Sequence, residues 1–391
     1  MVKRPRILLI TRNLPPLVGG MERLNWHMAD ELAKQAEVKV IGPWGAATLR
    51  PKSVTLTEAP LKPLPLFLAA SLFWGLWITL RWKPDIILAG SGLTAPIAWS
   101  LSKLCGARSV AYLHGLDIIV NHSLYRRLWR PTFSKLDRVV VNSTPTKALA
   151  ITAGVNPSNI DIVYPGVSLP NAPQPTESIA EFRERYGLTG KKVLLSVGRL
   201  TARKGLREFV ELSLPTIVQA EPDAMLLVIG ETPKNSLAPG IQSVESIQKQ
   251  AEKSGVAGYI KFLGAINDKT LATAYNAATL HVFPVRHIPD DPEGFGMVAI
   301  EAAAHGLPTV AFAMGGVVDA VAQGQSGYLV HPGDYLAFSE AVTRILADGS
   351  YAWQTSSYTF ATQFAWPQLG KKMRKIMQIR EETKSAINGN E

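Results

Sequence analysis

The sequence predicts an α/β protein with two domains, each built on a doubly wound parallel sheet. Short apolar runs alternate with amphipathic helical segments, which is the rhythm of parallel β-α units. The alternation breaks once, in proline-rich Ser168–Thr176, and then restarts. The length of 391 residues suits two or three domains at roughly 150 residues each.

The first domain is predicted from residues 1–168. Arg6–Thr11 (RILLIT) is typical of a buried strand. Glu22–Gln35 is predicted to be a helix because Leu24, Met28 and Leu32 share one helical face. Further strands are predicted at Val38–Ile41, Ile86–Ala89, Ser109–Leu113 and Val139–Asn142.

Residues 169–185 are predicted to be a linker, residues 186–365 a second domain, and residues 366–391 a helical tail. The second domain's strands are predicted at Val193–Val197, Leu226–Ile229, Ile260–Leu263, Leu280–Phe283 and Thr309–Phe312. Its helices are predicted near Arg203–Val218, Val244–Lys253, Lys269–Ala277, Val298–His305 and Leu336–Ala347. The tail contains a basic helix over Gln368–Lys384. We expect a cleft between the domains, and ligands at the carboxyl ends of the strands.

The positive charge lies in the first half of the chain. Residues 1–170 hold 20 Lys and Arg against 9 Asp and Glu, whereas residues 171–391 hold 21 against 22. Such a field attracts phosphates, nucleic acid or an anionic membrane, although a basic face can also serve solubility alone.

Cysteine and targeting patterns exclude several classes of protein. A single cysteine, Cys105, excludes a disulfide framework, and no Cys/His spacing indicates a zinc site. The apolar run Ile7–Ile10 is too short for the core of a signal peptide, so we expect a cytoplasmic protein.

The segment Leu64–Leu80 contains 17 residues without a charge, the lower limit for a spanning helix. It could be a buried or partly exposed helix of the domain. Alternatively, it could lie in a membrane interface with Trp74, Trp77 and Trp82 at headgroup depth. A true span is disfavoured because it would interrupt the regular alternation of strands and helices.

Two strand ends of the first domain carry candidate ligand-binding residues. Gly19 and Gly20 lie between the first strand and its helix, where backbone amides can approach an anion. A plain turn is the alternative. His114 follows the strand that ends at Leu113, so it is placed to touch a ligand, although a lone histidine is often structural.

The second domain begins with a strand followed by two cations. Arg199 and Lys204 bracket a strand-to-helix turn, and both could converge on one diphosphate near the helix N-terminus. The alternative is that Arg199 and Lys204 are ordinary basic residues at the surface and bind no ligand.

The most specific pattern is Glu293–Glu301 (EGFGMVAIE). Gly294 and Gly296 open a loop after the strand Leu280–Phe283, and a helix is predicted to start near Met297. The amides of Phe295, Gly296, Met297 and Val298 would point at an anion. Glu293, before the helix, could accept bonds from hydroxyl groups, and Glu301, inside it, could accept two from a vicinal diol such as that of a ribose or hexose.

Together these residues resemble the retaining glycosyltransferases of family four, which have the GT-B fold. The resemblance covers nearly the whole chain in order and spacing. Its main pieces are Gly19-Gly20, His114-Gly115, Arg199 with Lys204, and the E-x7-E run Glu293–Glu301. Secondary matches are Asn142-Ser143, Pro165-Gly166-Val167, Phe262-Leu263-Gly264, and Gly315-Gly316 followed by Gly327.

The resemblance implies a fold of two Rossmann-like domains facing a cleft, with the last helix crossing back to the first domain. It also implies roles for residues of this chain. Arg199 and Lys204 would neutralise the donor diphosphate, Glu301 would hold the ribose, and Glu293 with the amides that follow would hold the sugar and distal phosphate.

The remaining roles are also implied by the resemblance. His114 would lie near the transferred sugar, and Gly19-Gly20 near the phosphates. Ile266 and Asp268 fall where relatives contact the base, and an aspartate there could accept from guanine, which hints at a GDP-sugar. An acid is also common at the start of the helix that follows.

The chemistry expected from the resemblance is hexosyl transfer with retention, through an oxocarbenium-like state. Two cations and a helix N-terminus would stabilise the leaving diphosphate, so we expect no metal and no cofactor. No D-x-D metal-binding motif occurs in the sequence.

The sequence therefore predicts a glycosyltransferase of cell-envelope polysaccharide, lipopolysaccharide or glycolipid synthesis. It would move a sugar, with mannose from a GDP-sugar favoured, to a lipid-linked or growing glycan acceptor. We expect peripheral contact with the anionic inner face of the cytoplasmic membrane and no nucleic-acid partner. The alternatives are a UDP-sugar-dependent transferase with a soluble acceptor, a GT-B epimerase or phosphorylase, a non-catalytic nucleotide-sugar-binding protein, and a nucleic-acid binder.

Overall fold

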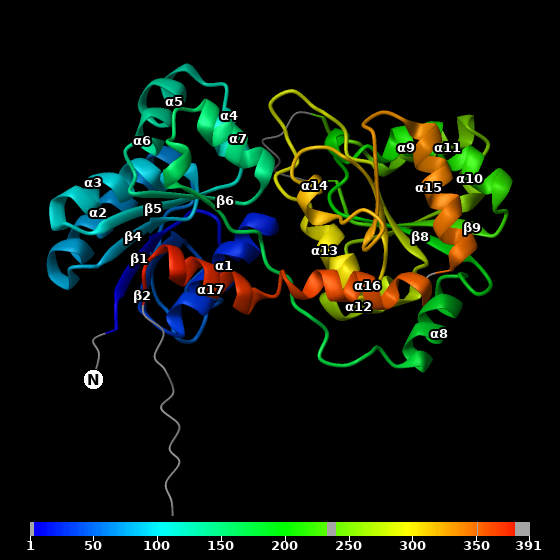
Figure 1. Cartoon of the computed structure of the whole chain (residues 1–391), viewed down its shortest axis with the longest axis horizontal. Helices are drawn as coiled ribbons and strands as arrows, with labels where there is room; N and C mark the ends of the chain where they lie inside the picture. Colours follow the sequence, from blue (N-terminus) through cyan, green and yellow to red (C-terminus); the bar gives the residue numbers. More distant parts are fainter. Residues whose placement is uncertain (1–3, 233–239, 350, 380–391) are drawn as a thin grey trace, which may run out of the picture. The chain divides into compact units, whose positions relative to one another are not determined.

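The chain forms two compact units in a computed structural model that describes residues 4–232, 240–349 and 351–379 (Figure 1). The first unit contains residues 1–166 and the tail from Trp366, and the second contains Val167–Ala365. Both units are α/β, as predicted, and each holds one parallel sheet.

The first unit is built on a seven-stranded parallel sheet with the order β3-β2-β1-β4-β5-β6-β7. Its strands are β1 (Arg6–Ile10), β2 (Glu37–Pro43), β3 (Thr55–Ala59), β4 (Ile86–Ala89), β5 (Arg108–Leu113), β6 (Arg138–Val141) and β7 (Ile160–Ile162). Its helices are α1 (Gly20–Ala33), α2 (Leu64–Trp82), α3 (Ala95–Cys105), α4 (Leu116–Ile119), α5 (Ser123–Leu128), α6 (Arg130–Phe133) and α7 (Thr144–Thr152), with α17 (Trp366–Ile376) from the tail. The strand order reverses direction between β1 and β4.

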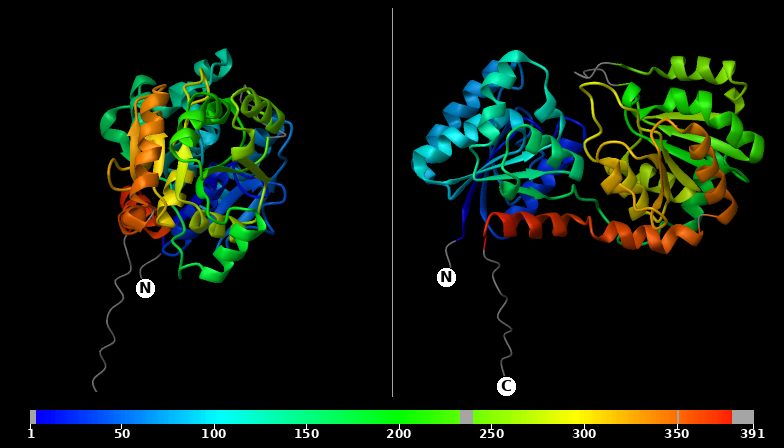
Figure 2. Two further views of the ribbon diagram at one scale, coloured as in Figure 1. Left: turned by 90° about the vertical axis from the view of Figure 1, so that its right-hand side faces the viewer. Right: turned by 45° about the horizontal axis from the view of Figure 1, so that its top comes forward.

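Helices cover both faces of this sheet. On one face, side chains of α2, α3, α6 and α7 form a core with the strands, and Phe67, Leu101 and Phe133 are fully buried there. Helices α1 and α17 pack against each other (Figure 2). The ring of Trp366 stacks on His27 of α1 with centroids 4.0 Å apart, so the last helix crosses back to the first unit, as predicted.

The second unit holds a six-stranded parallel sheet with the order β10-β9-β8-β11-β12-β13. Its strands are β8 (Lys192–Val197), β9 (Ala224–Ile229), β10 (Ile260–Gly264), β11 (Leu280–Phe283), β12 (Thr309–Phe312) and β13 (Gly327–Val330). Its helices are α8 (Thr176–Arg185), α9 (Leu206–Leu212), α10 (Leu214–Ala220), α11 (Val244–Lys253), α12 (Asp268–Ala277), α13 (Met297–Ala304), α14 (Val317–Ala320), α15 (Tyr335–Asp348) and α16 (Tyr351–Thr362). Here the order reverses between β8 and β11.

Two apolar clusters hold the helices to this sheet. One contains Phe209 of α9 and Phe338 of α15, and the other contains Phe182 of α8 and Tyr275 of α12. The unit is therefore a three-layer α/β/α arrangement, as the alternating apolar runs predict.

Helix α8 lies inside the segment predicted to be a linker, residues 169–185. The prolines of Ser168–Thr176 do precede the helix, but Ile179 and Phe182 then pack in the apolar cluster under α12. A polar sequence with two apolar side chains three residues apart is enough for a helix when a neighbouring helix covers them.

Two other predicted helices differ in extent. The segment Arg203–Val218 is split into a short 3-10 turn, α9 and α10, because Pro215 has no amide to continue a single helix. Helix α17 ends at Ile376, before Gln378 with its positive φ of 55°, so the predicted Gln368–Lys384 helix is shorter at this end. Residues 380–384 of the prediction lie outside the described residues.

Helix α2 corresponds to the charge-free segment predicted from the sequence. It is the one helix in the described residues that is long and apolar enough to cross a membrane. It nevertheless packs on α3, β2 and β3 and buries Phe67, Ile78 and Trp82 in the core of the first unit. The segment is therefore a partly exposed helix of the domain.

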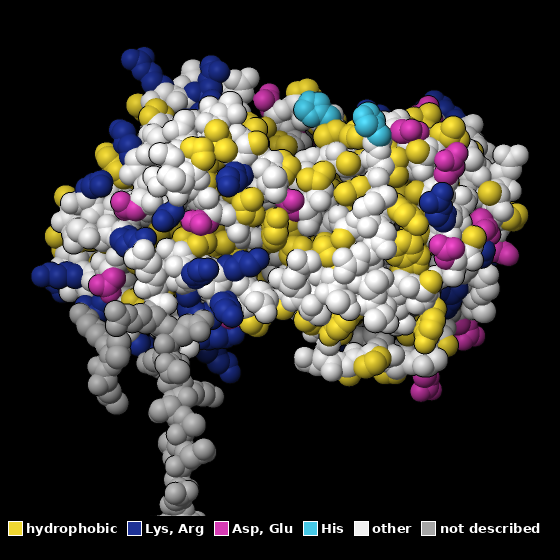
Figure 3. Space-filling model, viewed as in Figure 1, with side chains coloured by type: hydrophobic (Ala, Val, Ile, Leu, Met, Phe, Trp, Pro, Cys, Tyr) yellow, Lys and Arg dark blue, Asp and Glu magenta, His cyan; other side chains and the backbone are white. Residues whose placement is uncertain are grey.

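The two units differ in charge. The first unit, with the tail, holds 26 Lys and Arg against 12 Asp and Glu, whereas the second holds 15 against 19. On the face drawn in Figure 3, the Lys and Arg side chains gather over the first unit. The positive field of the protein is thus a property of that unit.

Candidate active site

Two loops meet at the point where the second sheet reverses its strand order. Strand β8 pairs with β9 on one side and β11 on the other. The loop after β8 carries Arg199 and Lys204, and the loop after β11 carries Glu293. In open parallel sheets, ligands bind at such a reversal, beyond the carboxyl ends of the strands.

A compact cluster of charges joins these two loops. The ammonium Nζ of Lys204 lies 3.0 Å from Oε2 of Glu293. The guanidinium of Arg203 contacts the same carboxylate oxygen through Nη1 and lies 3.3 Å from Oδ1 of Asp291 through Nε. The backbone amide of Arg286, also in the second loop, donates to the carbonyl of Arg203 at 2.8 Å. The cluster is largely shielded from solvent, since the side chains of Arg203 and Glu293 are 10% and 11% exposed.

The neighbouring charges set the ionisation of these groups. Burial alone would raise the pKa of Glu293, but Arg203 and Lys204 outweigh it and hold the pKa well below its usual range. Burial lowers the pKa of Lys204, against the pull of Glu293, and the nearby cations Arg203 and Arg199 lower it further. Two cations, Arg203 and Lys204, therefore pair with the carboxylates of Asp291 and Glu293, and the exposed Arg199 lies close enough to influence Lys204.

Two glycines allow the Glu293 loop to pack tightly. The amide of Gly316, after β12, donates to the carbonyl of Glu293 at 2.9 Å. A Cβ atom at Gly316 would lie 2.0 Å from the carbonyl oxygen of Gly294, and one at Gly315 would lie 2.4 Å from that of Glu293. The Gly315-Gly316 pair thus has a steric role: it lets the loop that carries Glu293 approach the end of β12.

The loop ends at the N-terminus of α13, as predicted. Gly296 has a φ of 90°, a left-handed conformation that favours glycine, and the helix starts at Met297. Phe295 is buried and packs 5.8 Å from the ring of Phe364. The first amides of the helix, including that of Val298, have no intrahelical acceptor, so this end of α13 favours an anion.

Glu301 lies one turn inside α13 and is mostly buried. The hydroxyl of Tyr275, from α12, donates to its Oε2 at 3.2 Å. The ring of Tyr275 stacks on His305 with centroids 5.2 Å apart, and burial lowers the pKa of His305 to about 4. Glu301 is therefore oriented by a neighbouring helix.

The two predicted base-contacting residues lie beyond the end of β10. Ile266 packs partly against the cluster beneath α8. Asp268 is the exposed first residue of α12, and the side chain that caps this helix is Asn267, which accepts from the amide of Thr270 at 2.8 Å. The carboxylate of Asp268 is therefore not occupied by capping its own helix.

In the first unit, Gly19 and Gly20 lie at the N-terminus of α1, as predicted. Glu22 lies beside them and takes a hydrogen bond from Asn13 Nδ2 at 2.9 Å. Its Oε2 would be 2.4 Å from a Cβ at Gly19. The glycine turn therefore packs against a carboxylate, a feature that glycine spacing alone does not predict.

His114 follows β5 and is buried. Its Nε2 lies 2.9 Å from the carbonyl oxygen of Gly90, which follows β4. Because a carbonyl only accepts, Nε2 is assigned as the protonated nitrogen, which leaves Nδ1 as an acceptor. Asp117 accepts from the backbone amide of His114 at 2.9 Å. The imidazole is thus held at the carboxyl edge of the first sheet.

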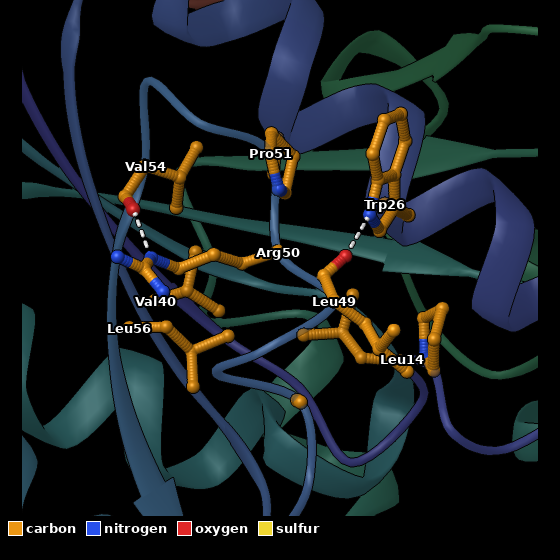
Figure 4. A pocket seen from close by; sticks show the side chains of 11 residues that line it. Leu14, Trp26, Val40, Leu49, Arg50, Pro51, Val54 and Leu56 are labelled. Atoms are coloured by element: carbon orange, nitrogen blue, oxygen red, sulfur yellow. Dashed lines mark hydrogen bonds between the residues drawn. The ribbon is translucent and has the colours of Figure 1, made fainter.

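An apolar pocket of the first unit lies between α1 and the loop before β3 (Figure 4). Trp26 donates from Nε1 to the carbonyl of Leu49 at 2.6 Å, and Arg50 donates from Nε to that of Val54 at 2.8 Å. These contacts tie the pocket wall together, and the pocket carries no carboxylate or histidine. Across residues 4–232, 240–349 and 351–379, no group of three or more His, Cys, Asp or Glu side chains is arranged to hold a metal ion.

The structure brings Lys204 and Glu293 into contact, with Arg199 nearby, and places Glu301 on the helix that follows. It also adds Arg203, Asp291 and Tyr275, which no local sequence pattern marks as site residues. Arg203 and its carboxylate partners are about 90 positions apart, so no local pattern signals their pairing.

Comparison with known proteins supports the family resemblance. The model of Glycosyltransferase Family 4 matches residues 18–170, and that of Glycosyl transferases group 1 matches residues 178–361. The chain is 28% identical to the GDP-mannose-dependent alpha-(1-6)-phosphatidylinositol monomannoside mannosyltransferase of Mycolicibacterium smegmatis, over 97% of this chain and all of that protein. It is 31% identical to a D-inositol 3-phosphate glycosyltransferase of Segniliparus rotundus, over 64% of this chain and 55% of that protein.

Solved structures share the fold. Anabaena HepE, in complex with UDP, superposes with a TM-score of 0.79 at 20% identity, covering 95% of this chain and 99% of its own. WaaG, a glycosyltransferase involved in lipopolysaccharide biosynthesis, superposes with a TM-score of 0.67 at 18% identity, with the same coverage. Glycosyltransferase family models match both halves of the chain, and solved structures of this fold cover 95% of it, so the chain belongs to the family-four type of GT-B glycosyltransferases.

Proposed function

We propose that this glycosyltransferase transfers a hexose with retention and without a metal ion, using the charge cluster of the second unit as its diphosphate site. The observation that carries the proposal is the contact between Lys204 and Glu293 at the reversal point of the sheet, with Arg199 beside it. A cationic pair beside the N-terminus of α13 suits the diphosphate of a sugar nucleotide.

The charge balance of the cluster supports this assignment. Arg203 lies against both Asp291 and Glu293, so it offsets much of their negative charge. Lys204 and Arg199 then leave a net positive field for the leaving diphosphate. As the bond between the sugar and the diphosphate lengthens, this field and the amides of α13 stabilise the charge that develops on the diphosphate.

The same arrangement suggests how the sugar is held. Glu293 has one carboxylate oxygen on Lys204 and Arg203, and its pKa is depressed, so it is an ionised acceptor for sugar hydroxyl groups. Glu301, oriented by Tyr275, is proposed to accept from the ribose hydroxyls. His114, with Nδ1 as an acceptor, is proposed to contact the transferred sugar. Gly19-Gly20 is proposed to lie near the phosphates of the donor.

A GDP-sugar, with mannose favoured, is the proposed donor. The full-length relative from Mycolicibacterium smegmatis is named as GDP-mannose-dependent, and the exposed carboxylate of Asp268 suits the donor groups of guanine. The competing candidate is a UDP-sugar-dependent transferase with a soluble acceptor, and the UDP bound to HepE, which shares the fold, is the observation in favour of a UDP-sugar.

The proposed acceptor is a lipid-linked or growing glycan at the inner face of the cytoplasmic membrane, with peripheral contact between the protein and anionic lipid. The relative from Mycolicibacterium smegmatis is named for an acceptor of the phosphatidylinositol class. The positive charge of the first unit is compatible with such a surface.

A donor screen in excess EDTA tests the proposal. GDP-mannose is expected to raise the melting temperature more than UDP-glucose, since a ligand at about 100 times its Kd stabilises a protein by about 2.7 kcal/mol. NMR of the released or transferred sugar should show the α-anomer that the donor carried. Inverted product, or activity that returns only with Mg²⁺ or Mn²⁺, would contradict the mechanism. Donor binding without turnover would indicate a non-catalytic binding protein.

A further inference from the structure

From Leu64 to Leu80, the outward face of α2 is apolar. Every side chain of Leu64–Leu80 that is exposed belongs to an apolar residue, and Phe73 and Leu80 are each 63% exposed. The exposed residues are Leu64, Pro65, Leu66, Ala69, Leu72, Phe73, Leu76, Trp77 and Leu80. A contiguous face of this kind on a folded domain marks an interaction site.

The inward face of the same helix carries its small and polar residues. Ser71, Gly75 and Thr79 are buried at intervals of four residues. A Cβ at Gly75 would lie 2.5 Å from Cδ1 of Leu101, so the glycine lets α2 pack closely on α3. The hydroxyls of Ser71 and Thr79 are buried without a hydrogen-bond partner among the described residues. Between Leu64 and Leu80 the helix thus buries its polar side chains and exposes only apolar ones, whereas an ordinary surface helix turns its polar side chains to water.

The helix is anchored in the domain. Phe67, Ile78 and Trp82 lie in the core cluster between the sheet and its covering helices, and Trp82 also donates from Nε1 to Glu37 at 3.1 Å. Spanning a bilayer would remove these side chains from the core. A position along a membrane surface keeps them buried while the outward face contacts lipid.

The charged residues next to α2 indicate which partner its apolar face binds. Lys62 precedes the helix, Arg81 and Lys83 follow its apolar stretch, and no acidic residue lies between Glu58 and Asp85. The guanidinium of Arg81 lies 5.0 Å from the ring centroid of Trp77, so a cation borders the exposed face. A second copy of this chain would bring the same cations and repel, whereas an anionic bilayer offers apolar depth beneath a negative surface.

We propose that α2 docks flat on an anionic lipid bilayer, with Phe73, Trp77 and Leu80 inserted at the boundary between headgroups and acyl chains. Lys62, Arg81 and Lys83 would contact the lipid phosphates. The purpose of this docking rests on the proposed function, because docking would bring the enzyme to a lipid-linked acceptor.

Flotation of the full chain with phosphatidylcholine vesicles, with and without phosphatidylglycerol, tests the proposal. The protein should float with anionic vesicles at low salt and release partly at high salt. The double variant Phe73→Gln/Trp77→Gln should bind at least about tenfold less, because two inserted side chains are lost. The matched control, Leu212→Gln/Leu336→Gln, replaces two exposed apolar residues of the second unit and should float like the unchanged protein.

A charge variant separates attraction from insertion. Lys62→Glu/Arg81→Glu should abolish the preference for phosphatidylglycerol. Failure of the unchanged protein to float, or equal flotation of the Phe73→Gln/Trp77→Gln variant, would overturn the proposal. So would a dimer in sedimentation that this variant converts to monomer without any loss of lipid binding.

Binding of GDP by calorimetry distinguishes this proposal from the proposed function. The Phe73→Gln/Trp77→Gln variant should bind GDP unchanged, whereas Lys204→Ala should float normally and lose nucleotide affinity. Flotation can therefore fail while nucleotide binding survives, and the reverse also holds.

Discussion

Lys204 and Glu293, 89 positions apart, meet with Nζ 3.0 Å from Oε2 at the carboxyl edge of the second sheet. Each belongs to a loop that leaves one of the two strands flanking the reversal of strand order. Their contact ties the loops together and places a cation and a carboxylate at the position where open parallel sheets bind ligands.

Arg203 extends the contact between Lys204 and Glu293 into a network of charged groups. It pairs with Asp291 and Glu293, and its backbone carbonyl accepts from Arg286. Burial lowers the pKa of Arg203, but the two carboxylates outweigh it and raise the pKa overall, so the guanidinium stays charged. We infer that Arg203 positions Glu293 and leaves Lys204 and Arg199 available for the donor diphosphate.

Replacing Arg203 should destabilise the fold. Arg203→Gln leaves two buried carboxylates without their partner, and breaking a buried ion pair from one side costs about 3 kcal/mol or more. Urea unfolding should show this loss, whereas Arg185→Gln, at an exposed position of α8, should change stability little. Equal stability of the two variants would remove Arg203 from the network.

Acid should weaken the same network. The pKa of Glu293 is lower in the folded protein than its ordinary value of 4.5, so its contribution to stability is present above that pH. The contribution is lost as the pH falls through the depressed folded pKa. Below pH 4.5, the free energy of unfolding should therefore fall more steeply with decreasing pH for the unchanged protein than for Glu293→Gln. Equal slopes of the two proteins below pH 4.5 would contradict the ion pairing.

Glu301 and Glu293 should bind different parts of the sugar-nucleotide donor. Glu301→Ala should weaken binding of free nucleoside diphosphate, and Glu293→Ala should mainly weaken binding of the intact sugar donor. Tyr275→Phe, which removes the hydrogen bond to Glu301, should weaken nucleotide binding by about three- to tenfold. Calorimetry measures each loss, with Tyr351→Phe, at an exposed position, as the control. Equal losses of affinity for the diphosphate and for the sugar donor in both glutamate variants would contradict these separate roles.

Gly316→Ala should displace the Glu293 loop. The added methyl group would meet the carbonyl of Gly294 at 2.0 Å, and backbone atoms cannot rotate away as a side chain can. Turnover should fall by about tenfold or more, since small misplacement of catalytic groups is costly. Gly258→Ala adds a methyl group in open space and should leave turnover unchanged. Equal turnover rates of the two variants would show that Gly316 is not needed to position the Glu293 loop.

The sequence predicts the buried strands well and the edge strands poorly. Leu280–Phe283 and Thr309–Phe312 are found at their observed bounds because fully buried parallel strands read as continuous apolar runs. Of the four edge strands, Ile260–Gly264 is found, whereas Thr55–Ala59, Ile160–Ile162 and Gly327–Val330 are missed. Edge strands face solvent and are short or polar, so their apolar pattern is weak.

The candidate site is predicted in part for a similar reason. Arg199, Lys204, Glu293 and Glu301 stand at strand ends and follow a recognisable spacing. Arg203 and Asp291 have no such spacing, and their pairing depends on how two loops pack. The hydrogen bond from Tyr275 to Glu301 likewise joins two helices, which a linear pattern does not indicate.

Turnover of the sugar nucleotide by Lys204→Ala tests the central claim most directly. The unchanged protein and Lys253→Ala, which removes an exposed lysine of α11, should consume the donor at equal rates in EDTA. Lys204→Ala should be slower by about 10²-fold or more, because one preorganised charge facing the leaving diphosphate is lost. Full activity of Lys204→Ala would contradict the assignment of this cluster as the diphosphate site.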